Sequence, residues 1–227
     1  LAVAFGGKVA VSVTDPILRV FTKTYDATGN LTAESDGKGV STTYGYDSAD
    51  QKVWMEDRAG NRWDYAYNEF RELVRTTAPA AVSDGVSHRN TIEREYDKNG
   101  RVVRELDPYS RQTTHEYVAN GNEVAVVDRL GNRWMKQYDA ANRAIAERDP
   151  EGSVKRTIYD AAGRVGIQIS PNGDRSTHEY DGRGRLTRWI DPEGYDWVYT
   201  YDGNGNILDV EDALGGHYVM TYGPRNE

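Results

Sequence analysis

A tyrosine recurs along this 227-residue chain at intervals of 21 residues, and this period constrains the fold more than any other feature. One interval differs, because Tyr67 and Tyr96 lie 29 residues apart. A fixed period of 20–50 residues is typical of repeat proteins, in which each unit contacts mainly its neighbours. The column consists of Tyr25, Tyr46, Tyr67, Tyr96, Tyr117, Tyr138, Tyr159, Tyr180, Tyr201 and Tyr222. We therefore expect residues 1–227 to form a single array of about ten repeats.

Turn-forming residues repeat in step with the tyrosines. A four-residue turn opens at Asp15, Asp36, Asp57, Asp107, Asp128, Asp149, Asp191 and Asp212, with Ala78 and Ser170 in the two remaining positions. Its complete form is Asp149, Pro150 and Gly152 in one repeat and Asp191, Pro192 and Gly194 in another. Aspartate can accept a hydrogen bond from the backbone two residues on, proline presets φ, and glycine tolerates positive φ. Another turn follows each tyrosine. The residue four positions after the tyrosine is Gly, Asn or Asp in nine of ten repeats, and it is Arg71 in the other.

The segments between the turns have the alternation of short β-strands. Residues 40–46, for example, place Thr42, Tyr44 and Tyr46 on one side. Turns about ten residues apart leave strands of roughly five to seven residues joined by hairpins, which predicts an all-β antiparallel meander of about twenty strands. At about 4.8 Å per strand the ribbon would be ~95 Å long. Accumulated twist would make it coil into a curved or spiral band or close on itself.

A parallel β-helix with one coil per repeat is the alternative fold. Its interior would require stacked aliphatic columns. The positions two residues before the tyrosines instead include Lys23, Arg94, His115, Lys136 and His178. This pattern favours the meander.

Composition excludes several classes of function. Hydrophobic residues make up 37% of the chain, yet 16 tyrosines and 5 tryptophans argue against disorder and suit a single sheet wetted on both faces. The net charge of −8 and the lack of a basic run argue against nucleic-acid binding. The absence of cysteine excludes disulfides and thiolate metal sites. Residues 1–13 are apolar but too short to span a membrane. The chain starts without methionine and stops inside a repeat, so we expect it to be a fragment of a longer protein.

No residue pattern predicts catalysis, a cofactor or a metal. His115 and His178 hold the same position in repeats three units apart, about 29 Å along a meander, which is too far for a catalytic pair. Residues 202–206 resemble the opening of a calcium loop, but Ile207 and Ala213 stand where that loop needs Gly and Glu. G-x-S-x-G, P-loop and H-E-x-x-H motifs are absent. We expect a protein that is not an enzyme.

Two features leave alternatives open. Trp63, Trp134 and Trp197 each lie four residues before a column tyrosine, on its face. They would contact a glycan or a polypeptide cargo, or they would stabilise the sheet through cross-strand pairs of roughly 0.2–1 kcal/mol each, which we favour. The long interval holds eight extra residues within 79–90. We expect a loop at one rim, which either contacts another part of a shell or is a tolerated insertion.

The repeats resemble those of the Rhs/YD-repeat family over residues 15–224. Tyr-Asp pairs occur at 25–26, 46–47, 96–97, 138–139, 159–160, 180–181 and 201–202, and a Gly-Arg/Asn-Leu/Val/Ile element follows, as at 29–31, 100–102, 163–165, 184–186 and 205–207. The family includes bacterial Rhs-type polymorphic toxins, the B and C components of insecticidal toxin complexes, and teneurins. The resemblance implies a β-ribbon that forms part of a hollow shell around a C-terminal toxic domain.

From this resemblance we expect a secreted bacterial toxin, type VI secretion being one route. Its partners would be the remainder of the parent shell and the toxin cargo. The self-cleaving segment that follows the repeats in many members has no counterpart here. A binding module for a glycan or a cell-surface partner is the alternative function. Strands left unpaired at the ends of the ribbon would favour self-association.

Overall fold

The computed structural model describes residues 2–5, 8–14, 20–36, 38–83 and 86–223, and all elements in these ranges are β-strands. The described strands belong to one 21-stranded sheet in which successive strands pair antiparallel. This confirms the predicted all-β meander. The parallel β-helix is wrong, because like segments of consecutive repeats are separated by an antiparallel strand.

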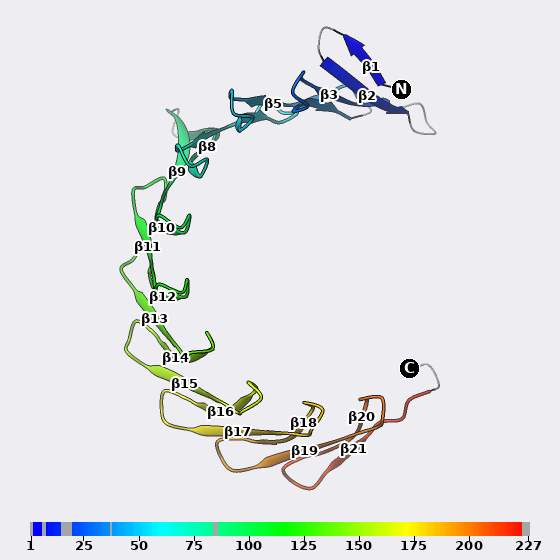
Figure 1. The fold of residues 1–227 in the computed structure, drawn as a ribbon, viewed down its shortest axis with the longest axis vertical. Coiled ribbons are helices and arrows are strands. Elements are labelled where there is room, and N and C mark those ends of the chain that lie inside the picture. The colour runs from blue at the N-terminus through cyan, green and yellow to red at the C-terminus, as the bar shows by residue number, and fades with distance from the viewer. Residues whose placement is uncertain (1, 6–7, 15–19, 37, 84–85, 224–227) are drawn as a thin grey trace. The chain divides into compact units, whose positions relative to one another are not determined.

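The chain divides into two compact units, each of which is a run of hairpins. Unit 1 holds residues 1–115 and 128–130, and unit 2 holds residues 116–127 and 131–227. Strands β1 to β10 of unit 1 are Ala2–Phe5, Lys8–Thr14, Val20–Tyr25, Leu31–Ser35, Ser41–Tyr46, Lys52–Glu56, Arg62–Tyr67, Leu73–Ser83, Val86–Tyr96 and Val102–Leu106, and β11, Gln112–Tyr117, crosses the boundary. Strands β12 to β21 of unit 2 are Glu123–Val127, Arg133–Tyr138, Ala144–Arg148, Val154–Tyr159, Val165–Ile169, Arg175–Tyr180, Leu186–Ile190, Asp196–Tyr201, Ile207–Glu211 and His217–Val219. Figure 1 shows β12 to β21 following one another in chain order.

The turns at both edges of the ribbon share one hydrogen-bond pattern. In the turn after Tyr25, the amide of Gly29 donates to the carbonyl of Asp26 at 3.2 Å, and the amide of Asp26 donates to the carbonyl of Asn30 at 2.9 Å. The fourth turn residue needs positive φ, which glycine supplies at thirteen positions. Asp50, Arg71, Ser110 and Asn142 adopt it too, with φ between 59° and 67°. Asp15 and Pro16 of the turn column lie outside the described residues.

The two edges differ by a β-bulge. Beside the column tyrosines the register slips by one residue: Tyr25 lies opposite Leu31, but Thr24 lies opposite Ala33. The same shift recurs beside a column tyrosine in seven further hairpins (β5–β6, β7–β8, β9–β10, β13–β14, β15–β16, β17–β18 and β19–β20). Short hairpins at the other edge, such as β4–β5, keep a regular register. Because a bulge increases local twist, each repeat carries its own source of bending. Curling of the whole ribbon stays a prediction.

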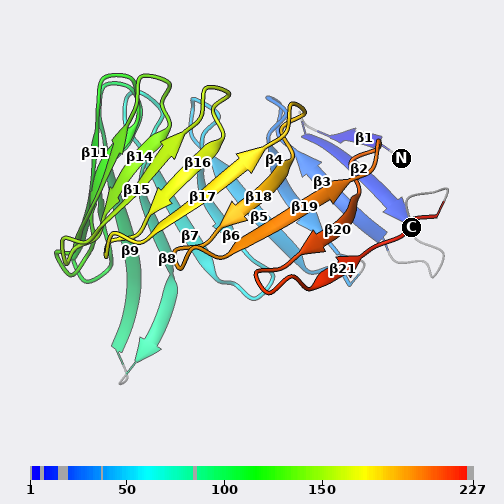
Figure 2. The ribbon, with the colours of Figure 1, turned by 90° about the horizontal axis from the view of Figure 1, so that it is seen from below.

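The eight extra residues lengthen a hairpin. The prediction of a loop at the rim is wrong, because β8 and β9 each contain 11 residues and pair along their length, with a register shift between Thr77 and Ala80. Figure 2 shows this hairpin projecting beyond the ends of its neighbours. At its base, the Arg89 guanidinium donates to the Asp64 carboxylate of β7 at 2.5 Å.

The sheet has almost no buried interior. Among the residues whose side chains are described, only Ala125 and Asp107 are buried. Most domains bury apolar side chains between two layers, whereas most side chains on these strands are half-buried. Stability must therefore come mainly from contacts between adjacent strands and adjacent repeats.

Candidate functional site

The column tyrosines connect each repeat to the one before it. The hydroxyl of Tyr46 donates to the carbonyl of Leu31 at 3.0 Å, and Leu31 is the residue opposite the preceding column tyrosine, Tyr25. The corresponding bonds, at 2.7–3.0 Å, join Tyr67 to Lys52, Tyr96 to Leu73, Tyr138 to Glu123, Tyr159 to Ala144, Tyr180 to Val165 and Tyr201 to Leu186. We call this contact the tyrosine lock. It satisfies a carbonyl next to each bulge, where the ladder is interrupted.

The column tyrosine nearest the C-terminus has a different partner. Tyr222 follows β21 and contacts the sulfur of Met220 at 3.8 Å. Burial raises the pKa of Tyr46, Tyr67 and Tyr201, which keeps the hydroxyl protonated as a donor.

In unit 2 an arginine strengthens the lock. Arg164 donates from Nε to the Asp160 carboxylate at 2.7 Å, and its guanidinium lies 4.5 Å from the ring centre of Tyr180 in the next repeat. Arg143 and Arg185 do the same with Asp139 and Tyr159 and with Asp181 and Tyr201. This explains the Gly-Arg element of the sequence: glycine makes the turn, and arginine joins its own turn to the next tyrosine.

The carboxylates of the turn aspartates accept hydrogen bonds from backbone amides of the same turn. Oδ1 of Asp57 accepts hydrogen bonds from the amides of Ala59 and Asn61, at 2.8 and 2.9 Å. The Asn61 side chain also donates a hydrogen bond to this carboxylate. That bond and the two amide hydrogen bonds hold the pKa of Asp57 below its usual value. No group of three or more metal-ligating side chains occurs in the described ranges. The carboxylates therefore act as turn-forming groups.

The two complete proline turns follow the same geometry. Oδ1 of Asp149 accepts from the amide of Ser153 at 2.8 Å, and Gly152 has a φ of 93°. Oδ1 of Asp191 accepts from the amide of Tyr195 at 2.9 Å, and Gly194 has a φ of 88°. Pro150 and Pro192 occupy the second turn position, where a fixed φ suits the turn.

The three predicted tryptophans lie on the face that carries the tyrosine column, which we call the tyrosine face, but their surroundings differ. Trp63 in β7 lies half-buried opposite Met55. Trp197 in β19 lies opposite Trp189, with ring centres 6.5 Å apart. Trp134 in β13 lies opposite Val126 and is 41% exposed. They occupy three separate strands and form no common ladder.

The sequence did not predict which residues lie opposite the tryptophans on neighbouring strands. Trp189 lies opposite both Trp197 and His178, although it belongs to no repeat column. Burial lowers the pKa of His178, and its Nδ1 has no hydrogen-bond partner among the described residues. His217 bonds to Asp209 at 2.8 Å, and this carboxylate raises its pKa. No nucleophile is hydrogen-bonded to either histidine in the described ranges, and the side chain of His88 lies outside them.

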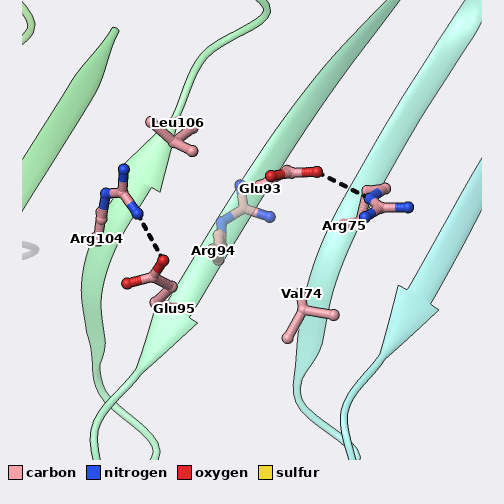
Figure 3. A pocket seen from close by; sticks show the side chains of 7 residues that line it. All are labelled: Val74, Arg75, Glu93, Arg94, Glu95, Arg104 and Leu106. Atoms are coloured by element: carbon pink, nitrogen blue, oxygen red, sulfur yellow. Dashed lines mark hydrogen bonds and ion pairs between the residues drawn. The ribbon is translucent and has the colours of Figure 1, made fainter. Parts of the chain in front are cut away.

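Cross-strand ion pairs cover much of the opposite face. Arg75 pairs with Glu93 at 3.0 Å and Arg104 with Glu95 at 2.6 Å, as Figure 3 shows. These residues line an open hollow of about 150 Å³ across β8, β9 and β10, with Val74 and Leu106 at its ends. Because its charges pair with one another, we assign this hollow to sheet stabilisation.

The geometry defines a class: a β-ribbon protein made of two-stranded repeats joined by tyrosine locks. The RHS repeat family model matches residues 25–53, 117–154, 138–177 and 180–217. These matches cover more than half of the chain, so the protein belongs to the RHS repeat family.

Solved structures show the same fold. The crystal structures of TcdB2-TccC3-TEV and of TcdB2-TccC3-Cdc42 each align with a TM-score of 0.51 at 14% sequence identity. Each alignment covers 90% of this chain and 14% of the matched chain. The protein thus spans about one seventh of these two chains. No curated protein matches it. The described residues form no helix with the length and apolar character needed to cross a bilayer.

Proposed function

We propose that this chain is a wall segment of an RHS-type toxin shell that encloses a toxic polypeptide for delivery. The single observation that carries this proposal is the unbroken pairing of short antiparallel strands, reinforced from repeat to repeat by the tyrosine lock. The fold likeness to TcdB2-TccC3 supports it. The role is structural, and no residue of the segment performs covalent chemistry.

The physical requirement of such a wall is to separate two aqueous spaces with one layer of protein. Backbone donors and acceptors within the layer must be paired, because an unpaired group would weaken the ladder. Antiparallel pairing meets this need along the strands, and the tyrosine hydroxyls meet it beside the bulges. Both faces are polar enough to be wetted, in keeping with a mean hydropathy of −0.78.

The partners would be the remaining repeats of the parent protein and its cargo, in a secreted bacterial toxin. Within the described residues, β21 pairs only with β20. Its other edge is suited to another strand of the parent. In isolation the same edge would favour self-association.

Protection of the cargo from protease tests the proposal. The parent protein would carry a protease site within its cargo, and cleavage would be compared before and after mild denaturation. Arg164→Ala combined with Tyr180→Ala would loosen the wall, and Tyr195→Ala at an exposed tyrosine outside the column would serve as the control. We expect the cargo to be protected in the native protein and in the control and to be cleaved in the double variant. Equal cleavage of the cargo in the native and denatured parent would contradict the proposal.

A binding module remains the second candidate function, and one observation favours it. Trp134 is exposed, whereas Trp63 and Trp197 are half-buried against neighbouring strands. If the chain binds a ligand through a tryptophan, the site is therefore the surface around Trp134.

A further inference from the structure

We propose that the tyrosine face of β13, β14 and β15 contains a binding site for a sugar that carries a carboxylate, such as a uronic acid within a polysaccharide. The site is a hollow of about 210 Å³ beside Trp134. Lys136, Glu147 and Lys155 line it from the tyrosine face of the three strands, and the rest of its lining is Met135, Arg148, Asp149, Ser153 and Pro171. This inference stands independently of the shell function.

Trp134 is more exposed than Trp63 and Trp197, the two other tryptophans at this position of the repeat. Trp134 also lines a smaller hollow next to the first, with Val124 and Val126. Its indole ring is thus accessible between two depressions of the sheet. An exposed ring of this size offers a flat apolar surface with a polar edge. The ring carbons of a pyranose present a matching flat C–H surface.

The polar part of the site consists of three charged side chains without partners. Lys136 lies directly opposite Glu147, and Glu147 lies directly opposite Lys155. All three are exposed, and within the described part of the chain none forms an ion pair or a hydrogen bond. Opposite charges in such positions usually pair, as Arg75 does with Glu93 and Arg104 with Glu95. These three groups are therefore available to a ligand.

The combination selects an acidic sugar. The two ammonium groups would bind its carboxylate, and the carboxylate of Glu147 would accept a hydrogen bond from a ring hydroxyl. Arg148 and Asp149 also line the hollow and their charges cancel, so the lining has a net charge of +1 and favours an anionic ligand over a neutral one. The hollow is smaller than the ~300–1,000 Å³ of a drug-sized pocket, so it suits a single ring of a longer chain.

An unfolded polypeptide fits these observations less well. A surface that captures unfolded chains needs a continuous exposed apolar patch. Here the residues beside Trp134 that line the hollow from β13 to β15 are charged except for Met135. The equivalent row in β3, β4 and β5 is Lys23, Glu34 and Thr42. Arg94 lies opposite Glu105 in β9 and β10, and this pair forms a salt bridge. The row in β13 to β15 differs from both because it has a second lysine, Lys155.

Calorimetric titration of the chain with hexagalacturonate tests the site. The methyl-esterified hexamer tests the role of the carboxylate, and a glutamate hexapeptide tests whether any acidic polymer suffices. The variants are Trp134→Ala and Lys155→Gln, with Trp63→Ala as the matched control at the same repeat position. Because Trp134 and Lys155 are exposed, both variants should fold, and circular dichroism would verify it.

We expect hexagalacturonate to bind and the ester to bind at least tenfold more weakly. Trp134→Ala should weaken binding by about tenfold, the upper range for an aromatic contact. Lys155→Gln should weaken it and reduce its dependence on salt. Trp63→Ala should leave the affinity unchanged. The proposal is overturned if hexagalacturonate does not bind, if the glutamate peptide binds as tightly, or if Trp63→Ala weakens binding as much as Trp134→Ala.

Discussion

Each column tyrosine has two tasks at once. Its ring covers the sheet between two strands, and its hydroxyl reaches a carbonyl of the preceding repeat, as Tyr180 reaches Val165 at 3.0 Å. Phenylalanine would perform only the first task. The periodic hydroxyl thus explains why the column is tyrosine rather than another aromatic residue.

Tyr180→Phe tests this explanation. The substitution removes one hydrogen bond and leaves the Val165 carbonyl without that donor, so we expect the free energy of unfolding to fall by about 1 kcal/mol. Urea denaturation would measure it. Tyr195→Phe, at an exposed tyrosine outside the column, should change stability by less than half as much. Equal losses in both variants would argue against the lock.

Ser110 occupies a turn position that suits glycine. Its φ is 60°, whereas the equivalent Gly173 has a φ of 94°. A side chain with positive φ is strained by roughly 1–2 kcal/mol, offset in part by the greater freedom of glycine in the unfolded chain. We expect Ser110→Gly to raise the free energy of unfolding by ~0.5–1 kcal/mol, measured by thermal denaturation. The reverse change, Gly173→Ser, should lower it, although nothing lies within 4 Å to clash. Stabilisation by both changes would show that backbone strain does not decide these positions.

At the scale of strands, periodicity predicted most of what the structure contains. The turns after Tyr46 and at Asp57, and the strands between them, lie where the spacing of turn residues placed them. The bulge was missed, because a slip of one residue leaves the 21-residue period unchanged. The pair of Trp189 and Trp197 lies in the regular β18–β19 hairpin. It was missed because Trp189 belongs to no repeat column. The number of extra residues does not distinguish a loop from two longer strands, so the sequence predicts a loop where the structure has the long strands β8 and β9.

A substitution at Gly45 tests the pairing of β5 with β6 next to the bulge. This glycine lies opposite Trp54, and a Cβ at Gly45 would meet Nε1 of the indole at 1.9 Å. We expect Gly45→Ala to displace Trp54 and to destabilise the chain by about 1–3 kcal/mol, as overpacking does elsewhere. Gly182→Ala is the control, because nothing lies within 4 Å of that position. Near-UV circular dichroism would report the displaced indole. An unchanged spectrum together with unchanged stability would contradict the register.

At the scale of the molecule, charged side chains supply part of the stability that a buried apolar core supplies in other proteins. Ion pairs cover the opposite face, and aspartates hold the turns. Hydrogen bonds to the side chain of Arg143 and to the backbone of Arg164 and Arg185 hold the pKa values of Asp139, Asp160 and Asp181 below their usual range. A sheet stabilised in this way should be sensitive to pH.

Both extremes of pH should destabilise the protein. Because the folded pKa values of the turn aspartates lie below the unfolded value of 3.8, their contribution is present above that pH and is lost as pH falls through the folded values. Burial and a hydrogen bond to Glu34 raise the pKa of Tyr44 from 10.0 to about 12. Its contribution is present below pH 10 and is lost as pH rises toward 12. Thermal denaturation from pH 2 to pH 12 would measure both limbs, and a flat melting temperature below pH 4 would rule out the acid limb.

Electron cryomicroscopy of the parent protein with its cargo tests the shell function most directly. The account predicts that the described strands lie in the wall of a closed compartment, that successive strands run antiparallel around it, and that density for the cargo lies inside. An open ribbon with the cargo outside it would contradict the account.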